Sequence, residues 1–371
     1  MNEYILFRYI VEFLDVVGMD RLKKLQSLME ELGFTSFILT SNANIFYFTG
    51  FMGSGYLVVP LNGEYKLYVY PIDYEAAQTY CIQEIEIVKI KATSSIADIV
   101  SNLPSNLKKK VGFDRLEAEQ YLKVKDYVES INLSQDLVWR LRSIKDQEEI
   151  DRIAKAAEIT SKCMELASDI IGEGVRESEV KAEILEEMIE SGSDKPAFDL
   201  IVVSGERSSL PHGGIGDRTM GRGDMVIVDI GASYQGYCAD MTRTFYIGSN
   251  PPDEVLNIYN LILDTKNLVE ENTKSWILAS SLDEVARTMI TSKGYGEYFV
   301  HGLGHGIGIE VHEPPKINPA SQEILQENNV ITIEPGIYIP RKFGVRIEDT
   351  LVVGRDNVIK LTSHPYDLSV Y

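Results

Sequence analysis

Residues 301–315 read His-Gly-Leu-Gly-His-Gly-Ile-Gly-Ile-Glu-Val-His-Glu-Pro-Pro, and they hold three of the five histidines in the 371-residue chain. These are His301, His305 and His312, and glycines alternate with the residues around the first two. Because glycine has no Cβ, the backbone here can pass close to a ligand. Histidines gathered in a glycine-rich segment predict a binding or catalytic site. A loop that merely happens to hold histidines is the alternative.

Four acidic residues interrupt apolar runs elsewhere in the second half of the chain: Asp229, Asp240, Glu334 and Glu348. The run around Asp229 is continuously apolar, which predicts a strand buried on both faces. An unpaired carboxylate inside such a strand is costly, so Asp229 needs a partner. A turn near Gly236 predicts a hairpin that brings Asp229 and Asp240 close together.

One such acid can be a core polar group whose hydrogen bonds are satisfied within the protein. Four of them beside a histidine cluster instead predict bound cations, because four carboxylates and one imidazole supply about what two divalent ions need. Oxygen-rich ligation favours Mn²⁺, Co²⁺ or Fe²⁺ over a structural Zn²⁺, which prefers thiolate and imidazole.

Composition excludes several classes of function. The formal net charge of −20 argues against a nucleic-acid partner, since phosphate binding needs a basic patch. The three cysteines, Cys81, Cys163 and Cys238, are far apart and form no Cys-X-X-Cys motif, which indicates a reducing, cytoplasmic location. No apolar stretch is long enough for a membrane span, and residues 1–17 carry too many charges for a signal peptide.

The first part of the chain predicts a small α/β domain. Residues 20–32 have apolar side chains at helical spacing, and short strands and helices alternate from residue 37 to residue 127. This part contains no histidine, so we expect it to shape the site rather than to carry the chemistry. Residues 1–18 precede the first predicted helix, and their apolar residues also have helical spacing.

The second part predicts two helix pairs, at 145–170 with 177–189 and at 253–272 with 281–293. Each pair accompanies strands that carry acids, which suggests an internal duplication. The border between the two parts is expected near residue 140.

Six short segments then occur in a specific order over about residues 195–355. They are Leu-Pro-His212-Gly, Val-Asp229-Ile-Gly-Ala, Cys-Ala-Asp240-Met-Thr-Arg-Thr, Gly-His305-Gly-Ile-Gly-Ile-Glu-Val-His312-Glu, Ile-Glu334-Pro-Gly-Ile-Tyr and Gly-Val-Arg346-Ile-Glu348-Asp-Thr. In these segments the chain resembles the pita-bread metallopeptidase family, which contains methionine aminopeptidase, aminopeptidase P and Xaa-Pro dipeptidase (prolidase). The first part, with Phe37 to Gly50 and the linker from Leu141, resembles the creatinase-type domain of the proline-specific members.

The resemblance implies a fold and its division. An N-terminal extension over 1–18 would precede a creatinase-type α/β domain over 19–140 and an α+β pita-bread catalytic domain over 141–371.

The resemblance also implies roles for individual residues. Asp229 would hold one metal and His305 the other, with Asp240 and Glu348 bridging, while Glu334 would be both a ligand and the general base. The residues implied in substrate binding, of which the first two also stabilise the oxyanion, are His212, His312, His301, Arg346 and Lys316. Arg346 matches a position that supports the site, and His364 matches no functional position.

One departure bears on the substrate. In archaeal-type dipeptidases an arginine near the His-Glu motif is thought to read the substrate carboxylate, and Lys316 stands in its place here. Lysine pairs with a carboxylate only as a point charge.

The implied activity is dinuclear-metal hydrolysis of the peptide bond before proline, by a Xaa-Pro dipeptidase or, on longer peptides, by an aminopeptidase P. The cofactor would be two divalent ions per subunit, Mn²⁺ or Co²⁺, with Fe²⁺ or Zn²⁺ also compatible, and a homodimer is expected. An inactive binding module of the same fold is a third interpretation. It is disfavoured because such relatives lose metal ligands, whereas all five ligand positions are filled here.

Overall fold

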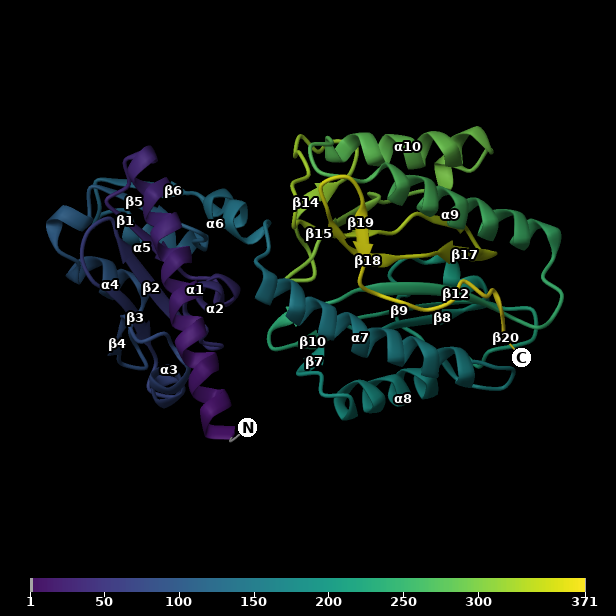
Figure 1. The fold of residues 1–371 in the computed structure, drawn as a ribbon, viewed down its shortest axis with the longest axis horizontal. Coiled ribbons are helices and arrows are strands. Elements are labelled where there is room, and N and C mark those ends of the chain that lie inside the picture. The colour runs from purple at the N-terminus through teal and green to yellow at the C-terminus, as the bar shows by residue number, and fades with distance from the viewer. Residues whose placement is uncertain (1–2, 371) are drawn as a thin grey trace. The chain divides into compact units, whose positions relative to one another are not determined.

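The computed structural model describes residues 3–370, with side chains from residue 18 onward. Within that range the chain forms two compact units, of which the first ends at Arg142 and the second begins at Ser143. The first unit is one mixed sheet with helices, and the second combines several sheets with two helix pairs (Figure 1). The expected fold class, an α/β domain followed by an α+β domain, is confirmed.

The first unit is organised around a six-stranded sheet of order β4-β3-β2-β1-β5-β6. Strand β2 is antiparallel to β1 and β3, and the other neighbours are parallel. The strands are β1 (Ser36–Leu39), β2 (Gly55–Pro60), β3 (Tyr65–Val69), β4 (Ile85–Lys89), β5 (Lys110–Phe113) and β6 (Ser130–Leu133). The helices are α1 (Glu3–Leu32), α2 (Asn42–Thr49), α3 (Tyr74–Tyr80), α4 (Ile96–Asn102), α5 (Ala118–Val124) and α6 (Gln135–Arg142), with a 3-10 turn η1 (Ser105–Leu107).

Helix α1 corrects one expectation. It begins at Glu3 and not near Asp20, because no proline or capping signal stops the helix between them. Gly18 suits a close approach here, since a Cβ at this position would lie 3.1 Å from the carbonyl oxygen of Phe48. The apolar stripe expected in residues 5–17 lies outside the side chains that the structure describes.

The second unit contains two larger sheets, of order β20-β12-β9-β8 and β14-β13-β15-β18-β19, together with the smaller sheets β11-β10-β7 and β16-β17. The first strands are β7 (Lys195–Pro196), β8 (Ile201–Ser204), β9 (Met225–Ile230), β10 (Ala232–Tyr234), β11 (Tyr237–Cys238), β12 (Met241–Ile247) and β13 (Gly304–Gly306). The remaining ones are β14 (Glu313–Ile317), β15 (Val330–Ile333), β16 (Gly336–Ile339), β17 (Phe343–Arg346), β18 (Asp349–Val353), β19 (Val358–Lys360) and β20 (Ser369–Val370).

Two helix pairs flank these sheets, as the sequence predicted. They are α7 (Gln147–Ile170) with α8 (Glu177–Glu190), and α9 (Asp253–Asn272) with α10 (Ala279–Ser292); the 3-10 turns are η2 (Gly205–Ser209) and η3 (Gly296–Tyr298). Figure 1 shows α7 and α8 along β8, β9 and β10, and α9 and α10 on the other side of the strands. Separate apolar cores fill the two interfaces, so the strand layer between the helix pairs is held from both sides.

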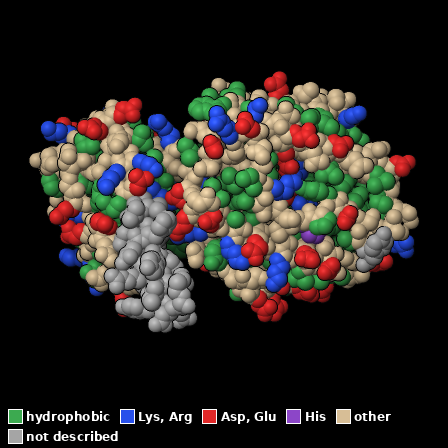
Figure 2. Space-filling view, in the orientation of Figure 1, with side chains coloured by type: hydrophobic (Ala, Val, Ile, Leu, Met, Phe, Trp, Pro, Cys, Tyr) green, Lys and Arg blue, Asp and Glu red, His purple; other side chains and the backbone are tan. Residues whose placement is uncertain are grey.

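On the face drawn in Figure 2, acidic side chains are scattered among lysines and arginines. They form no single dominant acidic patch on that face. Among the described residues, no helix combines the length and the apolar character that a membrane crossing requires.

Candidate metal centre

The second unit contains a cavity of about 520 Å³. Its lining includes every residue to which the sequence analysis gave a role in the site: His212, Asp229, Asp240, His301, His305, His312, Lys316, Glu334, Arg346 and Glu348. The ligand candidates are buried or nearly so, whereas His212, His312 and Lys316 are exposed to solvent. The cavity therefore has an acidic, buried part and a basic, exposed part.

The four acids reach the cavity from different strands. Asp229 lies within β9 and faces Thr242 of β12 across an antiparallel pair. Asp240 precedes β12, Glu334 lies between β15 and β16, and Glu348 lies between β17 and β18. The apolar runs around Glu334 and Glu348 are therefore not single strands, because each is broken at its acid.

The breaks have identifiable causes. Pro335 follows Glu334 and has no amide hydrogen to continue the ladder. At Glu348 the chain changes partner, since β17 pairs with β16 whereas β18 pairs with β15. Three of the four acids therefore lie where a strand ends, a common place for functional side chains on a rigid scaffold.

A compact group of donor atoms lies at the buried end of the cavity. One donor atom each from Asp240, His305 and Glu348 lie within 4.8 Å of one another. His305 Nε2 is 3.8 Å from Asp240 Oδ2 and 3.5 Å from Glu334 Oε1. A single cation can therefore reach ligands from strands far apart in the sequence.

The carboxylates have unused acceptor atoms. Asp229 Oδ1, Asp240 Oδ1 and Glu348 Oε1 are buried and have no hydrogen-bond partner among the described residues. A buried carboxylate oxygen without a partner is costly. Divalent cations would satisfy these oxygens, so the residues present fit a metal site.

Burial and mutual repulsion oppose ionisation of these acids when no cation is bound. Burial, followed by the charges of neighbouring carboxylates, raises the pKa of Asp240 and of Glu334 well above their usual ranges. Burial and the nearby Asp229 raise the pKa of Glu348 to about 8. Burial lowers the pKa of His305 to about 3, which keeps its ring neutral, as a metal ligand must be.

Arg346 is engaged within the protein. Its guanidinium donates to Asp229 Oδ2, to the Tyr338 hydroxyl at 2.7 Å and to Thr242 Oγ1 at 3.2 Å. Thr242 Oγ1 in turn donates to Glu348 Oε2 at 2.7 Å. Arg346 thus orients two of the acids, and a direct contact with substrate stays a prediction.

Two residues in this network were missed by the sequence analysis. Tyr338 Oη is 2.9 Å from His301 Nε2 and accepts from Arg346, and Thr242 links Arg346 to Glu348. Both lie inside the quoted segments, but an uncharged hydroxyl in a strand gives no periodic or charge signal. Their only sequence signal was the proximity to Glu334 and Asp240.

The glycines around His305 let neighbouring backbone segments approach closely. A Cβ on Gly304 would lie 2.1 Å from the carbonyl oxygen of Thr332, and one on Gly306 would lie 2.2 Å from that of Pro314. Both carbonyls belong to neighbouring chain segments, so the close approach is between strands. Gly302 and Gly304 also line the cavity, so an approach of this backbone to a ligand stays a prediction.

The remaining histidines differ in their surroundings. The ring of His312 packs edge-on against that of His305, with centroids 4.4 Å apart, and burial lowers its pKa. Burial lowers the pKa of His301 to about 4. His364 is half-buried outside the cavity, where it packs against Phe245 and contacts Ser168 Oγ.

Comparison with known proteins matches both parts of the chain to established families. Residues 151–355 match the profile of metallopeptidase family M24, and residues 21–144 match the creatinase/prolidase N-terminal domain. The Xaa-Pro dipeptidase of Pyrococcus furiosus is 39% identical over 352 residues, which cover 94% of this chain and 99% of that protein.

Solved structures are similar over almost the whole chain. A Xaa-Pro dipeptidase from Bacillus anthracis superposes with a TM-score of 0.88 at 34% identity and covers 95% of this chain and 100% of its own. An X-Pro aminopeptidase from Thermotoga maritima superposes with a TM-score of 0.86 at 33% identity and covers 94% and 99%.

Proposed function

The chain belongs to metallopeptidase family M24, and from that premise we propose that it is a Xaa-Pro dipeptidase (prolidase) that uses two divalent metal ions to cleave the peptide bond before proline. The 39% identity to the Pyrococcus furiosus Xaa-Pro dipeptidase supports the substrate class. The observation that carries the proposal is the set of unpartnered, buried carboxylate oxygens of Asp229, Asp240 and Glu348 beside His305 and Glu334.

We assign the metal ligands as Asp229, Asp240, His305, Glu334 and Glu348. The oxygen-rich donor set favours Mn²⁺ or Co²⁺, and Fe²⁺ or Zn²⁺ is also compatible. When bound, two such ions supply an activated water and polarise the scissile carbonyl.

The chain's own residues carry the proton and orient the substrate. Glu334 accepts the proton of the attacking water, since it lies in the buried part of the cavity beside His305. His212 and His312, at the exposed part, donate to the carbonyl oxygen as negative charge develops on it. Arg346 and Tyr338 hold Asp229 and His301 in place.

Lys316 is the candidate for recognition of the dipeptide's carboxylate. It lines the same cavity, is exposed, and carries a positive charge near His312. Lysine offers only a point charge, so this residue by itself leaves the choice between dipeptidase and aminopeptidase P open.

Aminopeptidase P activity on longer peptides is the second candidate, and it is supported by the similarity to the Thermotoga maritima X-Pro aminopeptidase. Rates on Met-Pro and on a Met-Pro tripeptide separate the two, with Met-Ala as the control for proline specificity. A dipeptidase cleaves Met-Pro faster than the tripeptide, and the reverse order would establish the aminopeptidase.

Metal removal tests the centre itself. We expect chelation to abolish hydrolysis and Mn²⁺ or Co²⁺ to restore it, with metal content measured by elemental analysis. Asp240→Asn should not be restored by added metal, because it removes a charged ligand. Full activity in a metal-free sample would contradict the dinuclear mechanism, and with it exclude the proposed role of all five ligands.

We also propose a cytoplasmic homodimer. The family resemblance supports the dimer, and three cysteines that form no disulfide, Cys81, Cys163 and Cys238, support a reducing compartment. Light scattering on the purified chain tests the oligomeric state.

A further inference from the structure

Residues 299–303 form a loop that brings His301 to the cavity. Two charged residues of α10, Asp283 and Arg287, form hydrogen bonds with the backbone of this loop. Arg287 donates to the carbonyl oxygen of Phe299 at 3.0 Å and to that of His301 at 2.9 Å. Asp283 accepts from the backbone nitrogen of Leu303 at 3.1 Å. The pair therefore holds both the beginning and the end of the loop.

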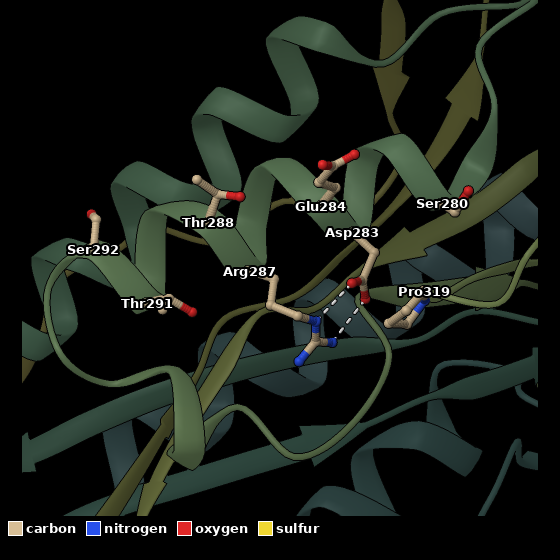
Figure 3. Close-up of a pocket in the computed structure, with 8 residues that line it drawn as sticks. All are labelled: Ser280, Asp283, Glu284, Arg287, Thr288, Thr291, Ser292 and Pro319. Atoms are coloured by element: carbon tan, nitrogen blue, oxygen red, sulfur yellow. Dashed lines mark hydrogen bonds and ion pairs between the residues drawn. The ribbon is translucent and has the colours of Figure 1, made fainter.

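Asp283 and Arg287 also pair with each other. Arg287 Nε and Nη2 donate to the two oxygens of Asp283 at 2.8 and 3.0 Å. Figure 3 shows these two side chains directed at one another, with Glu284 pointing away from them. Asp283 is 1% exposed, so its charge needs this partner.

The pair lines a second cavity of about 600 Å³, which also contains hydroxyls of Thr288 and Thr291. Its guanidinium and carboxylate compensate each other, and both also bind the loop. The charges of Arg287 and Asp283 are thus directed at the protein. They act on the loop.

Two sets of hydrogen bonds connect this loop to residues of the metal centre. The carbonyl oxygen of Leu303 accepts from the backbone nitrogen of Glu334 at 2.8 Å. The ring of His301 contacts the Tyr338 hydroxyl, which accepts from Arg346, the partner of Asp229. A shift of this loop would therefore move the backbone of Glu334 and loosen the support of Asp229.

We propose that Arg287, oriented by Asp283, is a positioning residue that sets the loop 299–303 and through it Glu334 and His301. This inference rests on the proposed function, because it gives a catalytic purpose to contacts outside the cavity. Arginine is required and not merely a positive charge, since three of its nitrogens donate in fixed directions to four acceptors.

Arg287→Ala is the test, in the metal-loaded full chain. We expect kcat on Met-Pro to fall about 10–100-fold, because small misplacements of a catalytic group cost this much, with little change in KM and unchanged metal content. Hydrogen exchange in the peptide covering 299–303 should become faster. Because the second cavity is open to solvent, low concentrations of guanidinium should restore part of kcat and slow the exchange, whereas tetramethylammonium should not.

Matched variants keep the result interpretable. Arg287→Lys retains the charge and should stay impaired, and it substitutes for the alanine variant if that one does not fold. Glu284→Gln in the same cavity and Arg152→Ala, which removes an i,i+4 Arg–Glu pair from α7, should behave as wild type.

Three outcomes in a folded variant would overturn the inference: wild-type kcat, unchanged exchange in 299–303, or a loss of kcat explained entirely by lost metal. If the wild-type chain does not cleave Met-Pro, the proposed function fails separately. The exchange of 299–303, with and without guanidinium, then decides the positioning role by itself.

Discussion

Glu334 differs from the other acids of the cavity in how its backbone and side chain are held. Its nitrogen is bound by the carbonyl of Leu303, and its carboxylate lies 3.5 Å from His305 Nε2 with 19% of the side chain exposed. Asp240 and Glu348, by contrast, have side chains that are deeply buried. An acid that touches the ligand cluster and still reaches the open cavity suits the exchange of a proton with water.

Glu334→Gln should therefore lower kcat by roughly 10²–10⁴-fold, the usual effect of removing a catalytic base. Steady-state kinetics on Met-Pro, with metal content measured on the same sample, check this. Glu327→Gln changes an exposed glutamate and should leave kcat as it is. Near-normal kcat in a metal-loaded Glu334→Gln enzyme would show that another group takes the proton.

At the scale of elements, the short strand β13 carries His305 between β14 and β15. It can lie between them only because Gly304 and Gly306 have no side chain, as carbonyl oxygens of Thr332 and Pro314 occupy the space of a Cβ. The neighbouring β15 leads directly to Glu334. The spacing of these strands thus sets the distance between His305 and Glu334.

Gly304→Ala should separate β13 from β15 and displace His305. We expect a destabilisation of about 1–3 kcal/mol, the typical cost of overpacking, together with weaker metal binding. Chemical denaturation and metal titration measure the two effects. Gly172→Ala is the matched control, because a Cβ there meets nothing within 4 Å, and equal behaviour of the two variants would refute the packing argument.

At the scale of the whole molecule, the second unit gathers several acids around one cavity, where burial and mutual repulsion make their ionisation unfavourable. Three acids, Asp240, Glu334 and Glu348, have raised pKa values in the absence of a cation. A group whose pKa is raised on folding contributes stability below its unfolded pKa, and this contribution is lost as pH rises through the folded value. For Glu348 the window runs from 4.5 to about 8.

The metal-free chain should therefore become less stable as pH rises from 4.5 to about 8, with a fall in Tm of roughly 5–10 °C. The metal-loaded chain should not, because bound cations favour the ionised carboxylates. Calorimetry at several pH values tests this. Glu348→Gln should reduce the pH dependence of the metal-free chain, and parallel curves for metal-free and metal-loaded protein would contradict the account.

Several features were determined by the sequence alone. The apolar periodicities predicted both helix pairs and most strands of the first unit, since these signals are local. Residue chemistry singled out the histidines and the four acids that line one cavity, because acids inside apolar runs are rare without a partner. Helix α2 gave no such signal, since it is apolar on most sides and has no amphipathic period.

Only the tertiary structure decided how the candidate residues are held. Thr242 and Glu348 are 106 positions apart, so their hydrogen bond follows from strand pairing and not from any local pattern. Tyr338 acquires its place from Arg346 and His301, and the breaks at Glu334 and Glu348 arise where the chain exchanges one strand partner for another. Local sequence encodes the type of an element and its buried residues, whereas hydrogen bonds between distant strands exist only once the chain is folded.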